Sequence, residues 1–183
     1  MNIITSDLSP LVDKIKKVSN DYVVVFADDE KKICKYFAKM FNRYDQFCQI
    51  VTEYDCEGTR NAIDKYGEQI AILIVDERMP DGLGHEVLQY AHRKIPLTNK
   101  TLISANCLDD LKEDYRVLHA NYPFLSKPWT PSEIEIFVLS AVEHYICLAN
   151  GLLGKRAERL KDINLENYLQ DCPEPYQGLL RFL

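Results

Sequence analysis

The sequence lacks the long apolar runs that a membrane span needs, and it has no cysteine pair at C-x-x-C spacing. No stretch approaches the roughly 18 consecutive apolar residues required to cross a bilayer, and no apolar secretory segment opens the chain. The six cysteines are scattered and several fall on apolar faces of predicted helices, which favours core thiols over disulfides. We therefore expect a soluble protein of the reducing cytoplasm, without a membrane partner.

Positive charge is also in short supply. The chain has 22 Lys and Arg against 28 Asp and Glu, a formal net charge of −6, and a pI of about 5.3. Nucleic-acid binding needs a basic surface, so we expect no nucleic-acid partner for this chain. Hydrophobic residues are plentiful, at 46% of 183 residues, which is enough for one core with flanking arms.

Short apolar runs rich in branched residues alternate with longer segments of helical period between residues 21 and 147. Five strands are predicted, at residues 22–27, 49–52, 70–75, 100–104 and 124–126. Four helices between them are predicted from apolar spacing: Ile33, Phe37 and Phe41; Thr59, Ile63 and Tyr66; Val87, Leu88 and Ala91; Leu111, Tyr115 and Leu118. The pattern predicts an α/β fold, a doubly wound five-stranded parallel sheet of order 2-1-3-4-5 with helices on both faces.

A fifth helix has the clearest start. Thr130 as N-cap, Pro131 at the first helical position and Glu133 three residues past the cap form a capping box. Its buried face is predicted to contain Ile134, Phe137, Val138, Ala141, Val142 and Tyr145.

Two arms are predicted to flank the domain at 21–147. Residues 1–20 form an N-terminal arm with a short helix, and residues 148–183 form a C-terminal helical extension. Apolar residues seven apart from Leu139 to Leu160 suggest that the fifth helix continues into a coiled-coil seam. Gly151 and Gly154 weaken that helix, so a continuous and a broken helix both remain open.

Polar residues collect where the predicted strands end. Asp28 and Asp29 follow the first strand, Asp76 ends the third, Ser104 ends the fourth and Lys127 follows the fifth. The carboxyl ends of parallel strands share one edge of a sheet, and ligands bind there where the strand order reverses. We therefore expect three carboxylates and one lysine in a small pocket.

The crowded carboxylates need a compensating charge. Two of them about 4 Å apart repel by roughly 1 kcal/mol in water and by about 4 kcal/mol at an effective dielectric near 20. Lys127 supplies one positive charge, and an oxygen-only ligand set suits a Mg²⁺-type ion, Mg²⁺ or Mn²⁺. Such an ion beside a carboxylate and an ammonium clamps phosphoryl oxygens, so Asp76 is predicted to act as a nucleophile.

Four motifs follow one another along the chain: VVVFADDE at 23–30, ILIVDERMP at 72–80 followed by Gly84-His85-Glu86, ISA at 103–105, and KPW at 127–129. In this order they resemble the receiver domain of two-component response regulators, which has a chemotaxis-regulator-like fold. The resemblance covers roughly residues 21 to 147 and implies a bound Mg²⁺ or Mn²⁺ as the cofactor.

The resemblance also implies a role for each site residue. Asp76 is similar to the phosphoacceptor, Asp29 to the direct metal ligand, and Asp28 to its water-linked neighbour. The remaining roles are a metal ligand in the backbone carbonyl of Arg78, a phosphoryl-binding Lys127 that precedes a cis-proline, a switch hydroxyl in Ser104 and an aromatic switch residue in Phe124.

The side chain of Arg78 departs from the commonest form of this pattern. One hypothesis is that it shields or orients the acyl phosphate and so modulates the phosphoryl lifetime; the other is that it extends into solvent and softens the acidic field. Phosphohydrolases with an aspartyl nucleophile need a carboxylate at this position as general acid, so we expect no multiple-turnover enzyme.

The implied function is Mg-dependent transfer of a phosphoryl group from a histidine kinase or a phosphotransfer protein to Asp76. The signal would pass as a surface change on helix 4, strand 5 and helix 5 to a downstream protein target or within a homodimer. Two alternatives remain open. One is a protein-binding module that works without phosphorylation, and the other is a truncated regulator whose catalytic output domain is absent.

Overall fold

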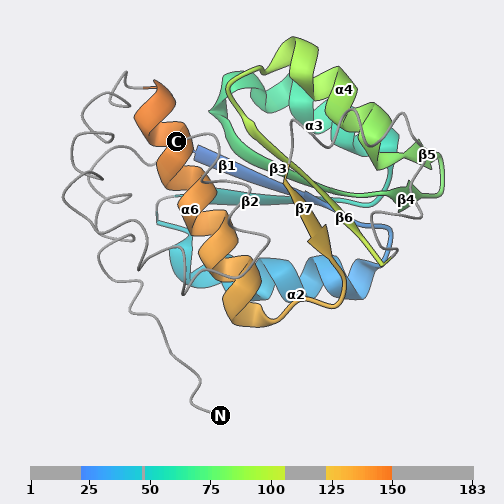
Figure 1. Ribbon diagram of the computed structural model, residues 1–183, viewed down its shortest axis with the longest axis horizontal. Coiled ribbons are helices and arrows are strands. Elements are labelled where there is room, and N and C mark those ends of the chain that lie inside the picture. The colour runs from blue at the N-terminus through green and yellow to red at the C-terminus, as the bar shows by residue number, and fades with distance from the viewer. Residues whose placement is uncertain (1–21, 47, 106–122, 150–183) are drawn as a thin grey trace.

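A computed structural model describes residues 22–46, 48–105 and 123–149 (Figure 1). Its main sheet is parallel and has the order β2-β1-β3-β6-β7, which confirms the predicted order 2-1-3-4-5 and the predicted fold class. The strands are β1 (Tyr22–Ala27), β2 (Cys48–Glu53), β3 (Ile70–Asp76), β6 (Asn99–Ser104) and β7 (Phe124–Ser126). Each lies within one residue of its predicted bounds.

The burial of the central strand, β3, explains why its position could be predicted from the sequence. All seven residues of β3 are buried, because β1 and β6 flank it and helices cover both faces of the sheet. A strand buried on both faces has no polar side to alternate with, and it therefore appears as a continuous apolar run. β1 shows the same pattern after its first residue.

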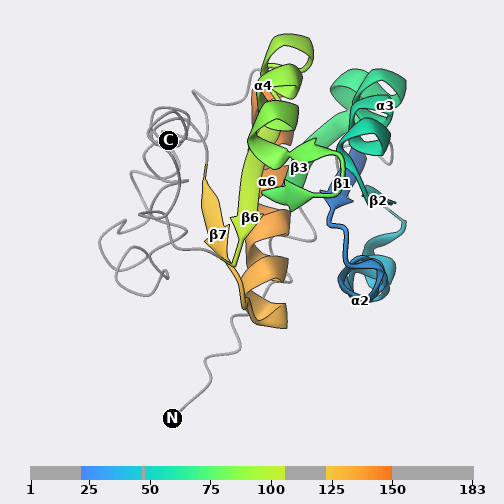
Figure 2. The ribbon, with the colours of Figure 1, turned by 90° about the vertical axis from the view of Figure 1, so that its right-hand side faces the viewer.

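The described helices form two layers around the sheet. Figures 1 and 2 show α3 and α4 on one face and α2 and α6 on the other. Their bounds are α2 (Lys31–Phe41), α3 (Cys56–Tyr66), α4 (Gly84–Lys94) and α6 (Pro131–Ala149), with 3-10 turns η1 (Asn42–Tyr44) and η2 (Gly67–Gln69) and a two-stranded hairpin of β4 (Arg78–Met79) and β5 (Gly82–Leu83). None of these described helices is both long and apolar enough to span a bilayer.

Some predicted elements lie outside the described residues. They are the helix predicted around Leu111 to Leu118, the arm at 1–20, and the extension at 148–183 beyond Ala149. The continuity of the last helix and the coiled-coil seam therefore stay predictions. Cys34, Cys48 and Cys56 are buried free thiols, as expected for core residues.

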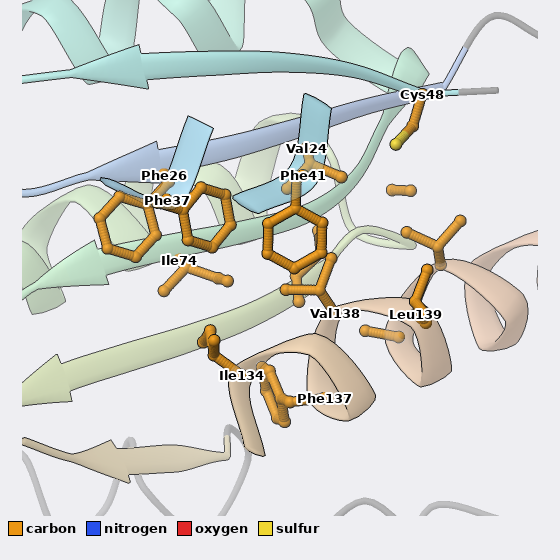
Figure 3. Close-up of a cluster of buried hydrophobic side chains, with 14 of the residues drawn as sticks. Val24, Phe26, Phe37, Phe41, Cys48, Ile74, Ile134, Phe137, Val138 and Leu139 are labelled. Carbon is orange, nitrogen blue, oxygen red and sulfur yellow. The ribbon is translucent and has the colours of Figure 1, made fainter. Parts of the chain in front are cut away.

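The core between the sheet and the α2/α6 layer is aromatic. Phe26 of β1 stacks on Phe37 of α2 with ring centroids 4.1 Å apart, and Phe37 contacts Phe41 at 4.6 Å. Figure 3 shows Ile134, Phe137 and Val138 of α6 on the opposite side of this cluster. All six residues predicted for the buried face of the fifth helix are buried.

The capping box of α6 forms as predicted. The backbone N–H of Glu133 donates to Thr130 Oγ1 at 3.2 Å, and the N–H of Thr130 donates to Glu133 Oε2 at 2.6 Å. Farther along, the Asn99 side-chain amide donates to the backbone carbonyl of Ala141 at 2.7 Å. The capping box fixes the start of α6, and the Asn99 contact ties the middle of the helix to the first residue of β6.

Thr101 of β6 has a buried hydroxyl with no hydrogen-bond partner among the described residues. An unpaired buried hydroxyl is destabilising, so we expect Thr101→Val to raise the free energy of unfolding by about 1 kcal/mol in urea denaturation. Thr98→Val is the matched control, because Thr98 Oγ1 donates to the carbonyl of Ile70 at 2.7 Å. It is expected to lower the same quantity by about 1 kcal/mol. Shifts of the same sign in both variants would contradict this account.

Lys100 is buried near the amino-terminal end of β6, away from the carboxyl-terminal ends of the strands. Its Nζ donates to the carbonyl oxygens of Ile95 at 2.8 Å, Pro96 at 3.2 Å and Thr98 at 2.7 Å, and so closes the loop between α4 and β6. Burial lowers the pKa of Lys100 to about 8. The lysine thus serves the loop as a hydrogen-bond donor, at a cost in desolvation of its charge.

This pKa makes the free energy of unfolding depend on pH. Above pH about 8 the folded chain releases a proton that the unfolded chain keeps until about 10.4, so stability rises with pH across that window. The rise attributable to Lys100 is at most about 3 kcal/mol, because its carbonyl partners favour the ammonium. Urea titrations at several pH values should show this rise in the wild type relative to Lys100→Met. Parallel pH profiles in the two proteins would refute it.

Candidate functional site

The strand ends bring the predicted site residues to one edge of the sheet. Asp28 follows β1, Asp76 is the last residue of β3, Ser104 is the last of β6, and Lys127 follows β7. Parallel pairing places neighbouring ends side by side, with Asp76 opposite Ile103 and Ser104 opposite Ser126. The prediction that these residues share an edge is confirmed.

Lys127 joins the two buried carboxylates. Its Nζ lies 2.7 Å from Asp28 Oδ2 and 2.5 Å from Asp76 Oδ1. The backbone N–H of Lys127 donates to the carbonyl of Ser104 at 2.8 Å, which fixes the start of the side chain at the end of β6. The peptide bond between Lys127 and Pro128 is cis, as the resemblance implied. The Lys127 side chain, which follows β7, therefore connects the ends of β1 and β3, two strands that do not pair with β7.

The other two carboxylate oxygens accept backbone N–H groups. Asp28 Oδ1 accepts the N–H of Glu30 at 2.9 Å, and Asp76 Oδ2 accepts the N–H of Arg78 at 3.0 Å. Asp28 is fully buried and Asp76 is 6% exposed, whereas Asp29 is exposed. The structure thus brings Asp28, Asp76 and Lys127 into one cluster and leaves Asp29 on its solvent side.

The electrostatics of this cluster show a shortage of positive charge. Burial raises the pKa of Asp28, and its hydrogen bond with Lys127 offsets only part of this effect. Burial alone would lower the pKa of Lys127, but its hydrogen bonds with Asp28 and Asp76 outweigh burial and raise it. With both carboxyls ionised, one ammonium faces two carboxylates, and the pocket favours a further cation.

This charge balance also tests whether the site suits the implied metal ion. No group of three or more His, Cys, Asp or Glu side chains within residues 22–46, 48–105 and 123–149 is arranged to hold a metal. Mg²⁺ usually binds through only one or two carboxylates and keeps several waters, so it does not need such a group. The two buried carboxylates, the exposed Asp29 and the backbone at Arg78 offer only oxygen donors. The residues present therefore fit a Mg²⁺-type ion.

A buried carboxylate lies directly after Asp76 and contacts a histidine, and no sequence pattern indicated this contact. Glu77 is 5% exposed, and its carboxylate lies 2.8 Å from His85 Nδ1 and accepts the His85 N–H at 3.2 Å. The backbone of Glu77 donates to Ile103 and accepts from Gly84, each at 2.9 Å. These bonds attach the segment after Asp76 to β6 and to the start of α4.

Gly84 allows α4 to begin against the carbonyl of Asp76. A Cβ at this position would lie 2.1 Å from the Asp76 carbonyl oxygen. No side chain tolerates such a contact, so the close approach of helix and strand requires glycine. The glycine was noted in the sequence only as part of the motif, because nothing in its neighbours reveals the contact.

The loop after Asp76 is also connected to α3. Asp81 accepts the N–H groups of Cys56 at 2.7 Å and of Glu57 at 2.8 Å, at the start of that helix. Burial alone would raise the pKa of Asp81, but these backbone hydrogen bonds outweigh it and lower the pKa. Arg78, three residues earlier, is exposed. The Asp81 carboxylate thus attaches the loop to α3, whereas Arg78 is exposed to solvent.

The two predicted switch residues occupy neighbouring strands. Ser104 is 4% exposed at the end of β6. Phe124 begins β7 opposite Leu102 and is partly buried against the core cluster on the α3/α4 face. Ser104 and Phe124 therefore lie on β6 and β7, the two strands that follow the Asp76 strand β3 in the order of the sheet.

Solved structures share this architecture. The signal receiver domain of an HD domain-containing protein from Pseudomonas fluorescens aligns with a TM-score of 0.60 at 17% identity, covering 73% of this chain and 95% of that one. A CheY-like response regulator receiver domain protein from Methanospirillum hungatei aligns at 0.59 and 16% identity, covering 68% and 95%. A response regulator receiver domain from Clostridium thermocellum aligns at 0.57 and 17%, covering 72% and 98%. The chain has a receiver fold.

The receiver fold is recognised here through structure and local motifs. No protein-family model matches the sequence, and no curated protein matches it. Each of the three alignments covers 95% to 98% of the solved receiver domain. Within that fold, the cluster of Asp28, Asp76 and Lys127 is the candidate site.

Proposed function

We propose that this receiver fold accepts a phosphoryl group on Asp76 from a histidine kinase or a phosphotransfer protein. The observation that carries the proposal is the contact of Lys127 Nζ with Asp76 Oδ1 at 2.5 Å, in a pocket shared with the buried Asp28. An ammonium held at a carboxylate by a second carboxylate is placed to bind the oxygens of an incoming phosphoryl group.

In the proposed reaction a carboxylate oxygen of Asp76 attacks phosphorus. The new O–P bond forms as the P–N bond of the donor's phosphohistidine breaks, and the imidazole leaves with the electron pair. Lys127 binds a phosphoryl oxygen and balances its charge, and Asp28 keeps the ammonium in position. Asp28, Asp29, Asp76 and the carbonyl of Arg78 would hold a Mg²⁺ or Mn²⁺ ion, which neutralises charge on the phosphoryl oxygens when bound.

Phosphorylation then adds negative charge next to Ser104. We propose that the Ser104 hydroxyl and Phe124 respond to it, and that the surface formed by the helix predicted around 111–118, β7 and α6 transmits the change. The recipient is a downstream protein target or a second copy of the chain. The chain acts once per phosphoryl group, as a cytoplasmic phosphoprotein switch.

Asp76→Asn is expected to abolish phosphorylation. The wild-type chain incubated with Mg²⁺ and acetyl phosphate should gain one phosphoryl group by intact-mass spectrometry, and EDTA should prevent the gain. Asp81→Asn is the matched control, because it removes a carboxylate from the same loop that binds α3 instead of Lys127. It should still be labelled. Labelling of Asp76→Asn, or no labelling of the wild type, would refute the proposal.

A further inference from the structure

Glu77, directly after the proposed acceptor Asp76, has every hydrogen-bonding group engaged. Its N–H donates to the carbonyl of Ile103, and its carbonyl accepts the N–H of Gly84, each at 2.9 Å. Its carboxylate contacts His85 twice: Oε1 lies 2.8 Å from the ring Nδ1, and Oε2 accepts the backbone N–H at 3.2 Å. We call Glu77 and His85 the loop clamp. The clamp and these backbone bonds hold the peptide units on both sides of Glu77.

The loop clamp closes the base of the loop that follows the acceptor. Within this loop Arg78 of β4 pairs with Leu83 of β5, and Glu77 and His85 lie just outside the two ends of that hairpin. On the acceptor side, the N–H of Arg78 donates to Asp76 Oδ2 at 3.0 Å. The contact of the clamp is therefore connected, through one residue of backbone, to both the Asp76 carboxylate and the backbone of Arg78.

The start of α4 does not by itself require this clamp. Leu83 is the N-cap residue of α4 and makes no side-chain cap hydrogen bond, and the Glu77 carboxylate accepts the His85 N–H instead. A Ser, Thr, Asp or Asn at the exposed position 83 would supply such a bond locally, without burial of a carboxylate. Capping from residue 77 differs in one respect, because it attaches the first turn of α4 to the residue after Asp76.

The stability of the core does not require the clamp either. Glu77 is 5% exposed, and a buried carboxylate is costly unless its oxygens are hydrogen-bonded. Apolar side chains in place of a buried polar pair often give equal or greater stability. An ionised carboxylate only accepts hydrogen bonds, so His85 Nδ1 carries a proton and donates to Glu77. The pair therefore supplies directed hydrogen bonds at a position where apolar packing would serve stability as well.

We propose that the loop clamp is a positioning pair for the metal site, which holds the Asp76 carboxylate and the Arg78 carbonyl where both can ligate one divalent ion. The inference rests on the proposed function, in which these two groups are metal ligands. Neither clamp residue is itself assigned as a ligand. Residues that orient metal ligands from behind change metal affinity by roughly 10- to 100-fold when they are removed.

The test is a titration of the full chain with Mn²⁺, in which electron paramagnetic resonance measures the free ion. The wild type is expected to bind Mn²⁺, and Asp76→Asn should weaken the binding. His85→Leu removes the donor to Glu77 without removing a carboxylate, and we expect it to lower the Mn²⁺ affinity by about tenfold. His85→Asn should bind within about twofold of the wild type, because its side-chain amide can donate in place of Nδ1.

Folding is controlled separately. The His85 side chain is 21% exposed, so its substitution is not expected to unfold the chain, and His85→Ala is a second variant that lacks the donor. Thr98→Val is the matched destabilised control, because it removes the hydrogen bond of Thr98 Oγ1 to the carbonyl of Ile70, near the amino-terminal end of β6. It should bind Mn²⁺ as the wild type does. A loss of affinity in Thr98→Val equal to that in His85→Leu would overturn the proposal, since general destabilisation would explain both.

Unchanged Mn²⁺ affinity in both His85→Leu and His85→Ala would also overturn the proposal, as would a loss in His85→Asn equal to that in His85→Leu. Acetyl phosphate labelling separates the clamp from the proposed function. The Mg²⁺ concentration for half-maximal labelling should rise by about tenfold in His85→Leu. A labelled wild type with the same midpoint in His85→Leu contradicts the clamp alone. A wild type whose Mn²⁺ affinity does not change in Asp76→Asn contradicts the metal site of the proposed function, and the clamp with it.

Discussion

Lys127→Met is expected to lower the free energy of unfolding by about 3 kcal/mol at neutral pH. The substitution leaves the buried carboxylates of Asp28 and Asp76 next to each other without their ammonium, and an uncompensated buried charge is strongly destabilising. The estimate is at the low end for a broken buried pair because the lysine side chain is 17% exposed. Urea unfolding monitored by circular dichroism measures the loss.

The loss should depend on pH in a defined direction. Burial already raises the pKa of Asp28, and loss of Lys127 raises it further. A carboxyl group whose pKa is higher in the folded than in the unfolded chain destabilises the fold as the pH rises from the unfolded pKa through the folded pKa. The loss of unfolding free energy in Lys127→Met should therefore be smallest in acid and largest at neutral pH. Asp28→Asn/Lys127→Met should recover much of the stability. A double variant no more stable than Lys127→Met would refute the charge explanation.

Gly84→Ala is expected to lower the free energy of unfolding by about 3 kcal/mol or more. The added Cβ would lie 2.1 Å from the carbonyl oxygen of Asp76 and 3.1 Å from Leu102 Cδ1. The first neighbour is backbone, which cannot rotate aside, so α4 must move away from β3. Thermal unfolding measures the loss, and acetyl phosphate labelling of the folded fraction should also fall because Asp76 moves with its carbonyl.

Gly82→Ala provides the control within the same loop. Its Cβ would meet Cys56 Sγ at 3.2 Å, a side-chain neighbour that can give way. We expect a loss within about 1 kcal/mol for this variant. Similar losses at the two glycines would show that the loop tolerates no change at all, and would contradict the specific contact between α4 and β3.

The sequence predicted the sheet well because of how parallel strands are buried. β1 and β3 are covered on both faces, so their apolar runs end where the strands end. The start of α6 was predicted because a capping box is a local signal, contained within four residues. Both features can be read without knowing what lies across the fold.

The candidate site was predictable only in part. Strand ends placed Asp28, Asp76 and Lys127 together, but the exposure of Asp29 depends on which way the chain turns after β1. The pairing of Glu77 with His85 spans a hairpin loop and has no periodic signal. The burial of Lys100 was likewise hidden, since its acceptors are backbone carbonyls of a loop that folds back on the strand.

The complete burial of β3 has a consequence for the unfolded chain. Its first six residues, Ile70 to Val75, are an uncharged run of high β-propensity without proline or glycine, the composition that self-associates into cross-β aggregates. In the native protein, β1 and β6 occupy both edges of this strand and deny it to other chains. Detachment of β6 therefore exposes the unpaired backbone edge of β3, which can pair with a strand of another chain. We expect the rate of this detachment to set how fast the protein aggregates.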